Sequence, residues 1–258
     1  MSKPKVLVTR RIPARALGRL EEACDVEVHE GDPLTPDDLA ARVVECQGLV
    51  TMFTDRVDAA VLAAAADLKV VATVAVGYNN IDVAAARARG VVVTNTPDVL
   101  TETTADLTWA IVLGMTRRIV EGDRLVRRGG WKGFAFDFML GSDLRGKQMG
   151  IVGLGRIGRA VAARARAFGM RIAFTRGTPA PGDDAEAMPL DRLLVTSDVV
   201  SIHCPLTPDT THLIDQPALA RMKRSAYLVN ASRGPIVDEA ALAWALKNRL
   251  IAGAGLDV

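Results

Sequence analysis

Short apolar runs rich in Val, Ile and Thr alternate along the whole chain with alanine-rich segments of helical period. In the first part, the apolar runs predict strands at residues 5–9, 26–29, 48–51, 69–74 and 91–95. The segments between them predict helices at residues 14–23, 36–45, 58–66 and 81–90. This alternation is typical of parallel βα units, and five such units are enough for a compact doubly wound sheet.

A second series of βα units follows an extended joint at residues 94–105. Pro97 disfavours a helical residue before it, and Thr101, Thr104 or Asp106 could cap a long apolar helix that runs to about Val126. Later apolar runs predict strands at 148–154, 170–175, 198–204, 226–232 and 251–258, with helices ending at 169 and spanning 190–197, 217–223 and 238–248. We therefore predict an α/β fold with two doubly wound parallel-sheet domains, residues 1–98 and 99–258.

The stretch at residues 127–147 breaks the periodicity. It contains five glycines together with Trp131, Phe134, Phe136 and Phe138. Exposed aromatics on an irregular arm would suit a contact between subunits, and they would equally suit packing over the adjoining domain. Both interpretations stay open at this point.

Composition excludes several classes of protein. Apolar residues make up 49% of the 258 positions and charged residues 24%, and the net charge of +2 gives no reason to expect nucleic acid or an anionic membrane as a partner. No stretch approaches the roughly 18 apolar residues needed to span a bilayer, and the N-terminal residues lack the pattern of a secretory signal. We expect a soluble cytoplasmic protein.

Few side chains are available for metal binding or proton transfer. Cys24, Cys46 and Cys204 lie far apart without metal-ligand spacing, so we expect core residues and no metal site. The only histidines are His29, His203 and His212.

Residues 150–176 carry the most informative motif. Gly153-x-Gly155-x-x-Gly158 follows an apolar strand and opens an alanine-rich helix that leads to a second strand, which is the context of a dinucleotide-binding Rossmann loop. The first glycine allows the tight turn, the second lets the backbone approach a pyrophosphate, and the third lets helix and strand pack closely. Backbone amides at the helix start would face the phosphates.

The end of the second strand indicates which dinucleotide binds. An acidic residue there would take the ribose hydroxyls of NAD, but the position eighteen residues after Gly158 is Arg176, with no carboxylate before Asp183. A guanidinium can hold a 2′-phosphate through paired charged hydrogen bonds. NADP(H) is therefore the expected cofactor and NAD(H) the alternative, unless Arg176 is only a solvated loop residue.

Several segments together resemble the D-2-hydroxyacid dehydrogenase family, and within it the glyoxylate/hydroxypyruvate reductases. The resemblance runs through nearly the whole chain, at residues 8–13, 71–83, 95–107, 150–162, 202–214, 228–246 and 251–258. It implies a flavodoxin-like substrate domain followed by the Rossmann domain. It also implies reduction of a small 2-oxo acid to the D-2-hydroxy acid by hydride transfer, and a homodimer.

The resemblance assigns substrate contacts to three residues. The backbone N–H groups of Val76 and Gly77 would hold the substrate carboxylate, which suits a loop whose amides can point at an anion. Arg233, at the end of an apolar strand, would be the catalytic residue that also binds the carboxylate and polarises the 2-oxo group.

The same resemblance assigns the cofactor contacts. Beyond the glycine loop and Arg176, they are Thr104, Arg156, Ile157, Cys204, Pro205, Thr210, Ala231, Ser232 and Asp257.

The family's proton donor is a histidine oriented by a glutamate, and the resemblance implies that both lie downstream of Val258. We expect none of the three histidines present to replace this donor, and we expect the sequence to be a C-terminally truncated form that also lacks the segment completing the first domain. Two alternatives remain, a catalytically inactive cofactor-binding fragment and a dinucleotide-sensing protein similar to a transcriptional corepressor.

Overall fold

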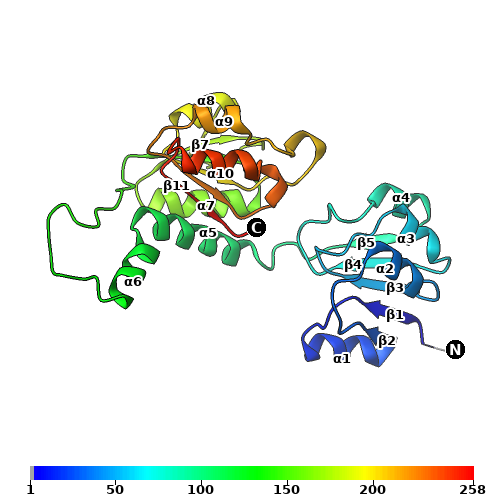
Figure 1. Cartoon of the computed structure of the whole chain (residues 1–258). Coiled ribbons are helices and arrows are strands. Elements are labelled where there is room, and N and C mark those ends of the chain that lie inside the picture. Colours follow the sequence, from blue (N-terminus) through cyan, green and yellow to red (C-terminus); the bar gives the residue numbers. More distant parts are fainter. Residues whose placement is uncertain (1–2) are drawn as a thin grey trace. The chain divides into compact units, whose positions relative to one another are not determined.

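The computed structural model describes residues 3–258, and the chain forms two compact units (Figure 1). The first unit ends at Val99, and the second spans Leu100–Val258. Each unit contains one parallel β-sheet with helices between its strands. The two-sheet α/β architecture expected from the sequence is therefore confirmed.

The first unit is a five-stranded sheet in the order β2-β1-β3-β4-β5, and every neighbouring pair is parallel. This is the flavodoxin-like strand order. Its elements in chain order are β1 (Lys5–Val8), α1 (Ala14–Ala23), β2 (Asp25–Val28), α2 (Pro36–Arg42), β3 (Gly48–Thr51), α3 (Ala59–Ala64), β4 (Val70–Thr73), α4 (Val83–Ala88) and β5 (Val92–Thr94).

Local sequence explains why these elements form. Leu7, Leu49 and Val71 lie at the centres of their strands and are at most 1% exposed, because parallel strands are covered on both faces. The side chains of Thr35 and Asp58 each accept a hydrogen bond from a first-turn amide of the helix that follows. Such caps satisfy amides that would otherwise have no partner.

The second unit is a six-stranded parallel sheet in the order β11-β10-β9-β6-β7-β8. Counted from β6, this is the strand order of a Rossmann domain. Its elements are α5 (Thr101–Thr116), α6 (Ile119–Arg127), β6 (Gln148–Val152), α7 (Arg156–Ala167), β7 (Arg171–Thr175), β8 (Glu186–Ala187), α8 (Leu190–Thr196), β9 (Val199–Ile202), η1 (Pro208–Thr210), α9 (Gln216–Arg221), β10 (Tyr227–Asn230), η2 (Gly234–Ile236), α10 (Glu239–Lys247) and β11 (Gly253–Leu256).

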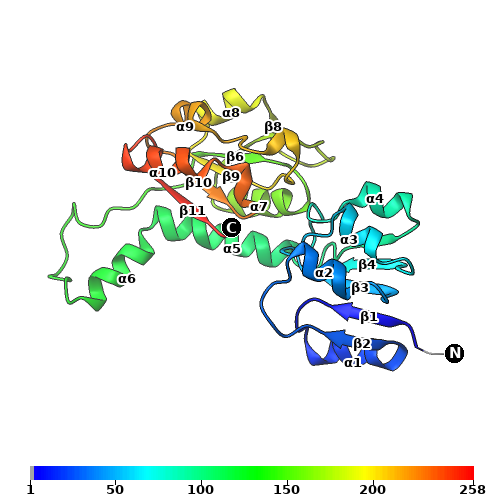
Figure 2. The ribbon, with the colours of Figure 1, turned by 45° about the vertical axis from the view of Figure 1, so that its right-hand side comes forward.

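Helices cover both faces of this sheet (Figures 1 and 2). One buried cluster joins the sheet to α5 and α7 through residues such as Trp109 and Ala165, and a second joins it to α8, α9 and α10 through residues such as Leu193 and Leu219. None of the helices within residues 3–258 is both long enough and apolar enough to cross a bilayer.

The prediction of one long helix from about Thr101 to Val126 is wrong about where the helix ends and about which residue caps it. The helix ends at Thr116, whose carbonyl accepts a 2.7 Å hydrogen bond from the Ser142 amide, and Arg118 then takes a left-handed conformation (φ 55°) before α6 begins. The left-handed residue ends the helix locally, and the contact with the distant Ser142 satisfies its last carbonyl. At the other end the N-cap is Leu100, without a side-chain cap, so neither Thr101 nor Thr104 nor Asp106 caps the helix.

Candidate active site

The glycine loop joins β6 to α7, and its first glycine needs a conformation that other residues rarely adopt. Gly153 has φ +106°, and a Cβ added there would lie 2.5 Å from the backbone nitrogen of Cys204. A Cβ on Gly158 would collide with the Gly153 carbonyl oxygen and would lie 3.2 Å from Ile151 of β6. Both positions therefore require glycine so that β6, α7 and the end of β9 can pack together.

Gly155 is different, because a Cβ added there would meet no atom within 4 Å. It is the N-cap of α7, and no side chain among residues 3–258 caps this helix. The first turn, with Ile157 half-buried and Arg156 exposed, thus opens onto free space. An uncapped helix N-terminus beside an open glycine fits the pyrophosphate of a dinucleotide.

Arg176 lies at the carboxyl end of β7, next to the glycine loop. Its carbonyl accepts a 2.8 Å hydrogen bond from the Leu154 amide, its side chain is exposed, and its Nη2 donates to the Asp209 carbonyl at 3.2 Å. The residue has a left-handed backbone (φ 58°), which costs a non-glycine residue about 1 kcal/mol and often marks a functional position.

The loop after β7 is fastened to α7 by an ion pair that the sequence pattern does not reveal. Arg159 Nε lies 3.0 Å from Asp183 Oδ2, and Arg159 Nη2 donates to the Thr178 carbonyl at 2.7 Å. Asp183 also accepts from the Ala180 amide at 2.7 Å. The Ala180 N–H and the Arg159 guanidinium together lower the pKa of Asp183. The first carboxylate after Arg176 is therefore already occupied by partners within the chain.

The loop after β9 forms the next wall. Burial raises the pKa of the Cys204 thiol, and the nearby positive charge of Arg176 offsets this only in part, so the thiol is protonated at neutral pH. The Thr210 hydroxyl donates to the Pro205 carbonyl at 2.7 Å and accepts from the Thr207 amide at 2.7 Å. Thr210 thus holds the turn in shape.

Arg233 follows β10 and is half-buried. Its Nη1 donates to the Ser232 carbonyl at 2.8 Å, and burial lowers the pKa of its guanidinium, which stays charged at neutral pH. Asn230, which sequence reasoning missed, donates to the Arg233 carbonyl at 2.8 Å and accepts from the Ser232 amide at 3.0 Å. Ser232 Oγ in turn donates to the Cys204 carbonyl at 2.6 Å. The sequence signal that could have identified Asn230 is its position as an asparagine at the end of a buried strand.

Most of the residues predicted to bind the cofactor thus gather at one edge of the second unit. They follow the carboxyl ends of the adjacent strands β7, β6, β9, β10 and β11, where ligands of parallel sheets bind. Ala231 lies in the loop after β10, and Asp257, whose amide donates to the Asn230 carbonyl at 3.0 Å, lies after β11. Thr104 lies in the first turn of α5, half-buried.

Val76 and Gly77 belong to the first unit, in the loop after β4. The Val76 carbonyl accepts a 2.8 Å hydrogen bond from the Asn95 side chain, and the Ala75 carbonyl accepts one of 2.9 Å from the Thr96 amide. Sequence reasoning also missed Asn95, although it lies directly after β5.

His203 offers little for proton transfer at neutral pH. Burial lowers the pKa of His203 to about 4, and its Nε2 lies 2.8 Å from Ser201 Oγ, so its ring is neutral at pH 7. His29 Nε2 lies 2.8 Å from the Asp32 carbonyl oxygen. No group of three or more His, Cys, Asp or Glu side chains within residues 3–258 is arranged to hold a metal ion.

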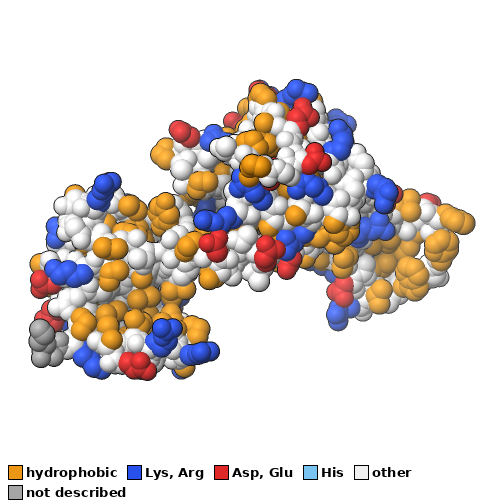
Figure 3. Space-filling view, turned by 180° about the vertical axis from the view of Figure 1, so that it is seen from behind, with side chains coloured by type: hydrophobic (Ala, Val, Ile, Leu, Met, Phe, Trp, Pro, Cys, Tyr) orange, Lys and Arg blue, Asp and Glu red, His pale blue; other side chains and the backbone are white. Residues whose placement is uncertain are grey.

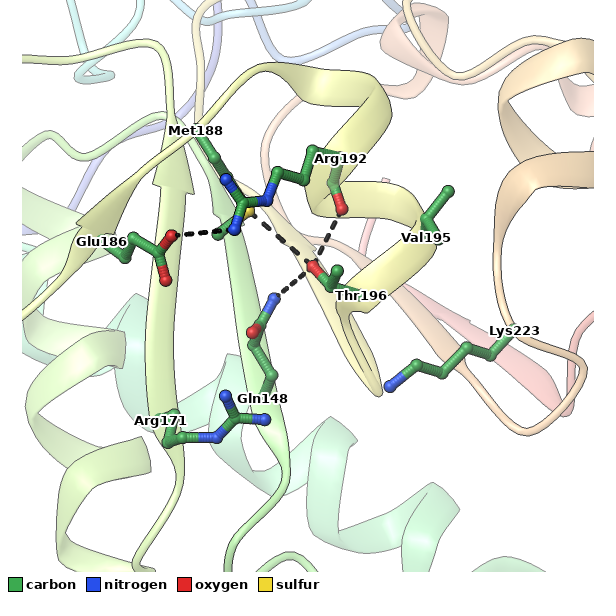
Figure 4. A pocket seen from close by; sticks show the side chains of 8 residues that line it. All are labelled: Gln148, Arg171, Glu186, Met188, Arg192, Val195, Thr196 and Lys223. Atoms are coloured by element: carbon green, nitrogen blue, oxygen red, sulfur yellow. Dashed lines mark hydrogen bonds and ion pairs between the residues drawn. The ribbon is translucent and has the colours of Figure 1, made fainter.

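A pocket of about 350 Å³ lies away from the glycine loop, at the amino ends of the strands (Figure 4). Gln148, Arg171 and Lys223 line it, and its charges are largely balanced: Arg192 lies 3.4 Å from Glu186, and Lys223 lies 2.9 Å from Asp198. Ligands of parallel sheets bind at the opposite, carboxyl edge, so the glycine loop marks the candidate active site.

Known proteins match this arrangement. The family model for the NAD-binding domain of D-isomer specific 2-hydroxyacid dehydrogenases matches residues 109–258. A glyoxylate reductase from Korarchaeum cryptofilum is 50% identical over an alignment 262 residues long. The alignment covers 99% of this chain and 79% of that protein. A protein of known structure from Thermus thermophilus is 49% identical with a TM-score of 0.91, over 98% of this chain and 81% of its own.

A further solved relative is an NADPH-dependent glyoxylate/hydroxypyruvate reductase from Sinorhizobium meliloti, in complex with NADP and malonate. It is 36% identical with a TM-score of 0.89, over 100% of this chain and 80% of its own. The resemblance inferred from the sequence motifs is thereby confirmed. The chain belongs to the D-isomer specific 2-hydroxyacid dehydrogenase family and is an NAD(P)-dependent dehydrogenase.

Proposed function

We propose that this protein reduces glyoxylate, and hydroxypyruvate as a second substrate, with NADPH as the preferred cofactor. The observation that carries the cofactor preference is the exposed guanidinium of Arg176 at the end of β7, with the next carboxylate, Asp183, already paired to Arg159. Relatives named glyoxylate reductase at 46–50% identity support the substrate. The Sinorhizobium meliloti relative supports both parts of the proposal.

The residues of the chain would divide the work as follows. When bound, the reduced nicotinamide would supply the hydride, and the 2-oxo oxygen would take up a proton from water or from an acid outside residues 3–258. In the first unit, the amides of Val76 and Gly77 would hold the substrate carboxylate. In the second unit, Arg233 would stabilise the negative charge that develops on the 2-oxo oxygen. Ile157, Gly158 and the open space beside Gly155 would accept the pyrophosphate, with Thr104, Arg156, Cys204, Pro205, Thr210, Ala231, Ser232 and Asp257 as the remaining cofactor contacts.

A direct assay tests the reductase proposal. Purified protein mixed with NADPH and glyoxylate should lose absorbance at 340 nm, and hydroxypyruvate should also be consumed. The opposite result is a protein that binds NADPH but consumes it with neither of these acids nor any other short 2-oxo acid. That result would instead support the inactive cofactor-binding or dinucleotide-sensing alternatives.

Replacing Arg176 by alanine should weaken NADPH binding roughly 10- to 100-fold, because charge-assisted hydrogen bonds to the 2′-phosphate are lost. The dissociation constant of NADH, which has no such phosphate, should change little. Fluorescence titration of both cofactors measures this. Arg171→Ala is the matched control, because Arg171 is an exposed arginine at the other end of β7. Equal weakening for both cofactors, or a wild-type preference for NADH, would contradict the assignment.

We also propose that the arm at residues 131–140 mediates a homodimer. Trp131, Phe134, Phe136 and Leu140 are 53–89% exposed, and Figure 3 shows apolar side chains gathered over this part of the second unit. The arm's aromatic rings contact each other, with Phe134 and Phe136 centroids 5.2 Å apart. An apolar surface of this kind usually binds a partner.

Light scattering after size exclusion should therefore give a mass near twice the chain mass of 27.5 kDa. The variant Phe134→Ser/Phe136→Ser should shift the particle toward the single-chain mass. A monomeric wild-type protein at micromolar concentration would refute the dimer, and a dimer that persists in the variant would exclude the arm as its interface.

A further inference from the structure

The loop after β4 is held by two hydrogen bonds that come from the same short segment. The Thr96 amide donates to the Ala75 carbonyl at 2.9 Å, and the Asn95 side chain donates to the Val76 carbonyl at 2.8 Å. Both donors directly follow β5, the strand that pairs with β4. Pro97 restricts Thr96 to extended conformations, so the donor segment is itself stiff.

These bonds determine where the next two amides point. Every peptide bond within residues 3–258 is trans, and in a trans peptide unit the carbonyl and the following N–H point in opposite directions. The carbonyls of Ala75 and Val76 both point toward residues 95–96. The N–H groups of Val76 and Gly77 therefore both point away from that segment, and neither has a hydrogen-bond acceptor among residues 3–258. Two adjacent amides aimed the same way form an anion-binding nest.

We propose that Asn95 is a positioning residue that aims the Gly77 amide at the carboxylate of the substrate. This inference rests on the proposed reduction of a 2-oxo acid. Asn95 acts through the Val76 carbonyl: without its donor, the peptide unit between Val76 and Gly77 is free to rotate, and the Gly77 N–H loses its fixed direction. The Thr96 bond holds only the preceding peptide unit, so it does not replace Asn95.

The far end of the same loop is fixed independently. The Asn80 side chain donates to the Met52 carbonyl at 3.1 Å and to the Asp55 carbonyl at 2.7 Å. The Val57 amide donates to the Asn80 carbonyl at 2.9 Å. Loss of Asn95 should therefore leave the loop attached and change only the orientation of its first amides.

Asn95→Ala should raise the KM for glyoxylate roughly tenfold, with a smaller fall in kcat and no change in the dissociation constant of NADPH. The effect should be specific for the carboxylate. The wild-type preference for glyoxylate over its uncharged methyl ester, measured as the ratio of kcat/KM values, should fall by the same factor. Asn95→Asp keeps the shape of the side chain but removes its hydrogen-bond donor. Its KM for glyoxylate should rise at least as much as that of Asn95→Ala, because the added negative charge repels the substrate.

Asn248→Ala is the matched control, because Asn248 also donates from its side chain to a backbone carbonyl at 2.8 Å, at the C-terminal end of α10. It should leave KM and the preference ratio unchanged. Circular dichroism should show the same melting temperature for the Asn95 variants and wild type within a few degrees, which separates positioning from unfolding.

A second measurement does not depend on turnover. Titration of the NADPH-bound wild type with oxamate should move the NMR resonances of the Val76 and Gly77 amides, and Asn95→Ala should lose mainly the Gly77 shift. If wild type neither reduces 2-oxo acids nor shows these shifts, the proposed function fails and the inference falls with it. If wild type responds and the Asn95 variants respond equally, the reductase stands and the role of Asn95 is refuted.

Discussion

Replacing Arg233 by alanine should lower kcat/KM for glyoxylate by about 100- to 1,000-fold, the usual cost of removing one preorganised donor to a developing oxyanion. The guanidinium is half-buried and charged, and it is held against the Ser232 carbonyl, so little reorganisation is needed when negative charge appears beside it. Steady-state kinetics monitored at 340 nm would measure the loss, and titration with NADPH should give a nearly unchanged dissociation constant.

Two further variants make this result specific. Arg233→Lys keeps the charge but loses the planar pair of donors, so it should recover only part of the activity. Arg224→Ala removes an exposed arginine before β10 and should behave as wild type. Near-normal turnover by Arg233→Ala would remove Arg233 from the mechanism, and a parallel loss of NADPH affinity would show that the residue supports the cofactor site instead.

The arrangement of strands was predictable from sequence because it depends on local patterns. Apolar runs of four to six residues become parallel strands whenever helices cover both faces of the sheet, as Leu7 and Ile151 illustrate by being fully buried. The glycine loop was equally readable, since Gly153 and Gly158 are constrained by backbone atoms within one βα unit and the end of β9.

Features that depend on distant partners were not predictable in the same way. The last carbonyl of α5 accepts a hydrogen bond from the distant Ser142 amide, and no local signal marks that contact. The pairing of Asp183 with Arg159 depends on the path of the loop after β7, which also forms the two-residue strand β8 that the pattern missed. The hydrogen bond from Asn95 to Val76 joins two strand ends that only the fold brings together.

Residues assigned through the family resemblance were predictable only in part. Cys204, Thr210 and Arg233 follow strand ends, so their approximate place came from the pattern, but their hydrogen-bond partners came only from the structure. Asn230 shows the difference most clearly: its two hydrogen bonds shape the loop that carries Arg233, although the sequence pattern predicted only that it belongs to a strand.

The glycine loop allows a sharp comparison of stability with binding. Gly153→Ala should destabilise the second unit by about 2–4 kcal/mol, because alanine is strained at φ +106° and its Cβ would press on the Cys204 backbone. Gly155→Ala should cost less than about 1 kcal/mol, since its Cβ enters open space. The same methyl group would occupy the approach of the pyrophosphate, so NADPH affinity should fall roughly tenfold or more.

Urea unfolding can separate these effects, because Trp109, Trp131 and Trp244 all lie in the second unit and their fluorescence reports on it alone. The expected result is a lower urea midpoint for Gly153→Ala and a nearly wild-type urea midpoint for Gly155→Ala. Only Gly155→Ala should keep its stability and still lose affinity for NADPH. If Gly155→Ala bound NADPH as tightly as wild type, the phosphates would not lie against that glycine. The N-terminus of α7 would then have to contact the phosphates from another direction.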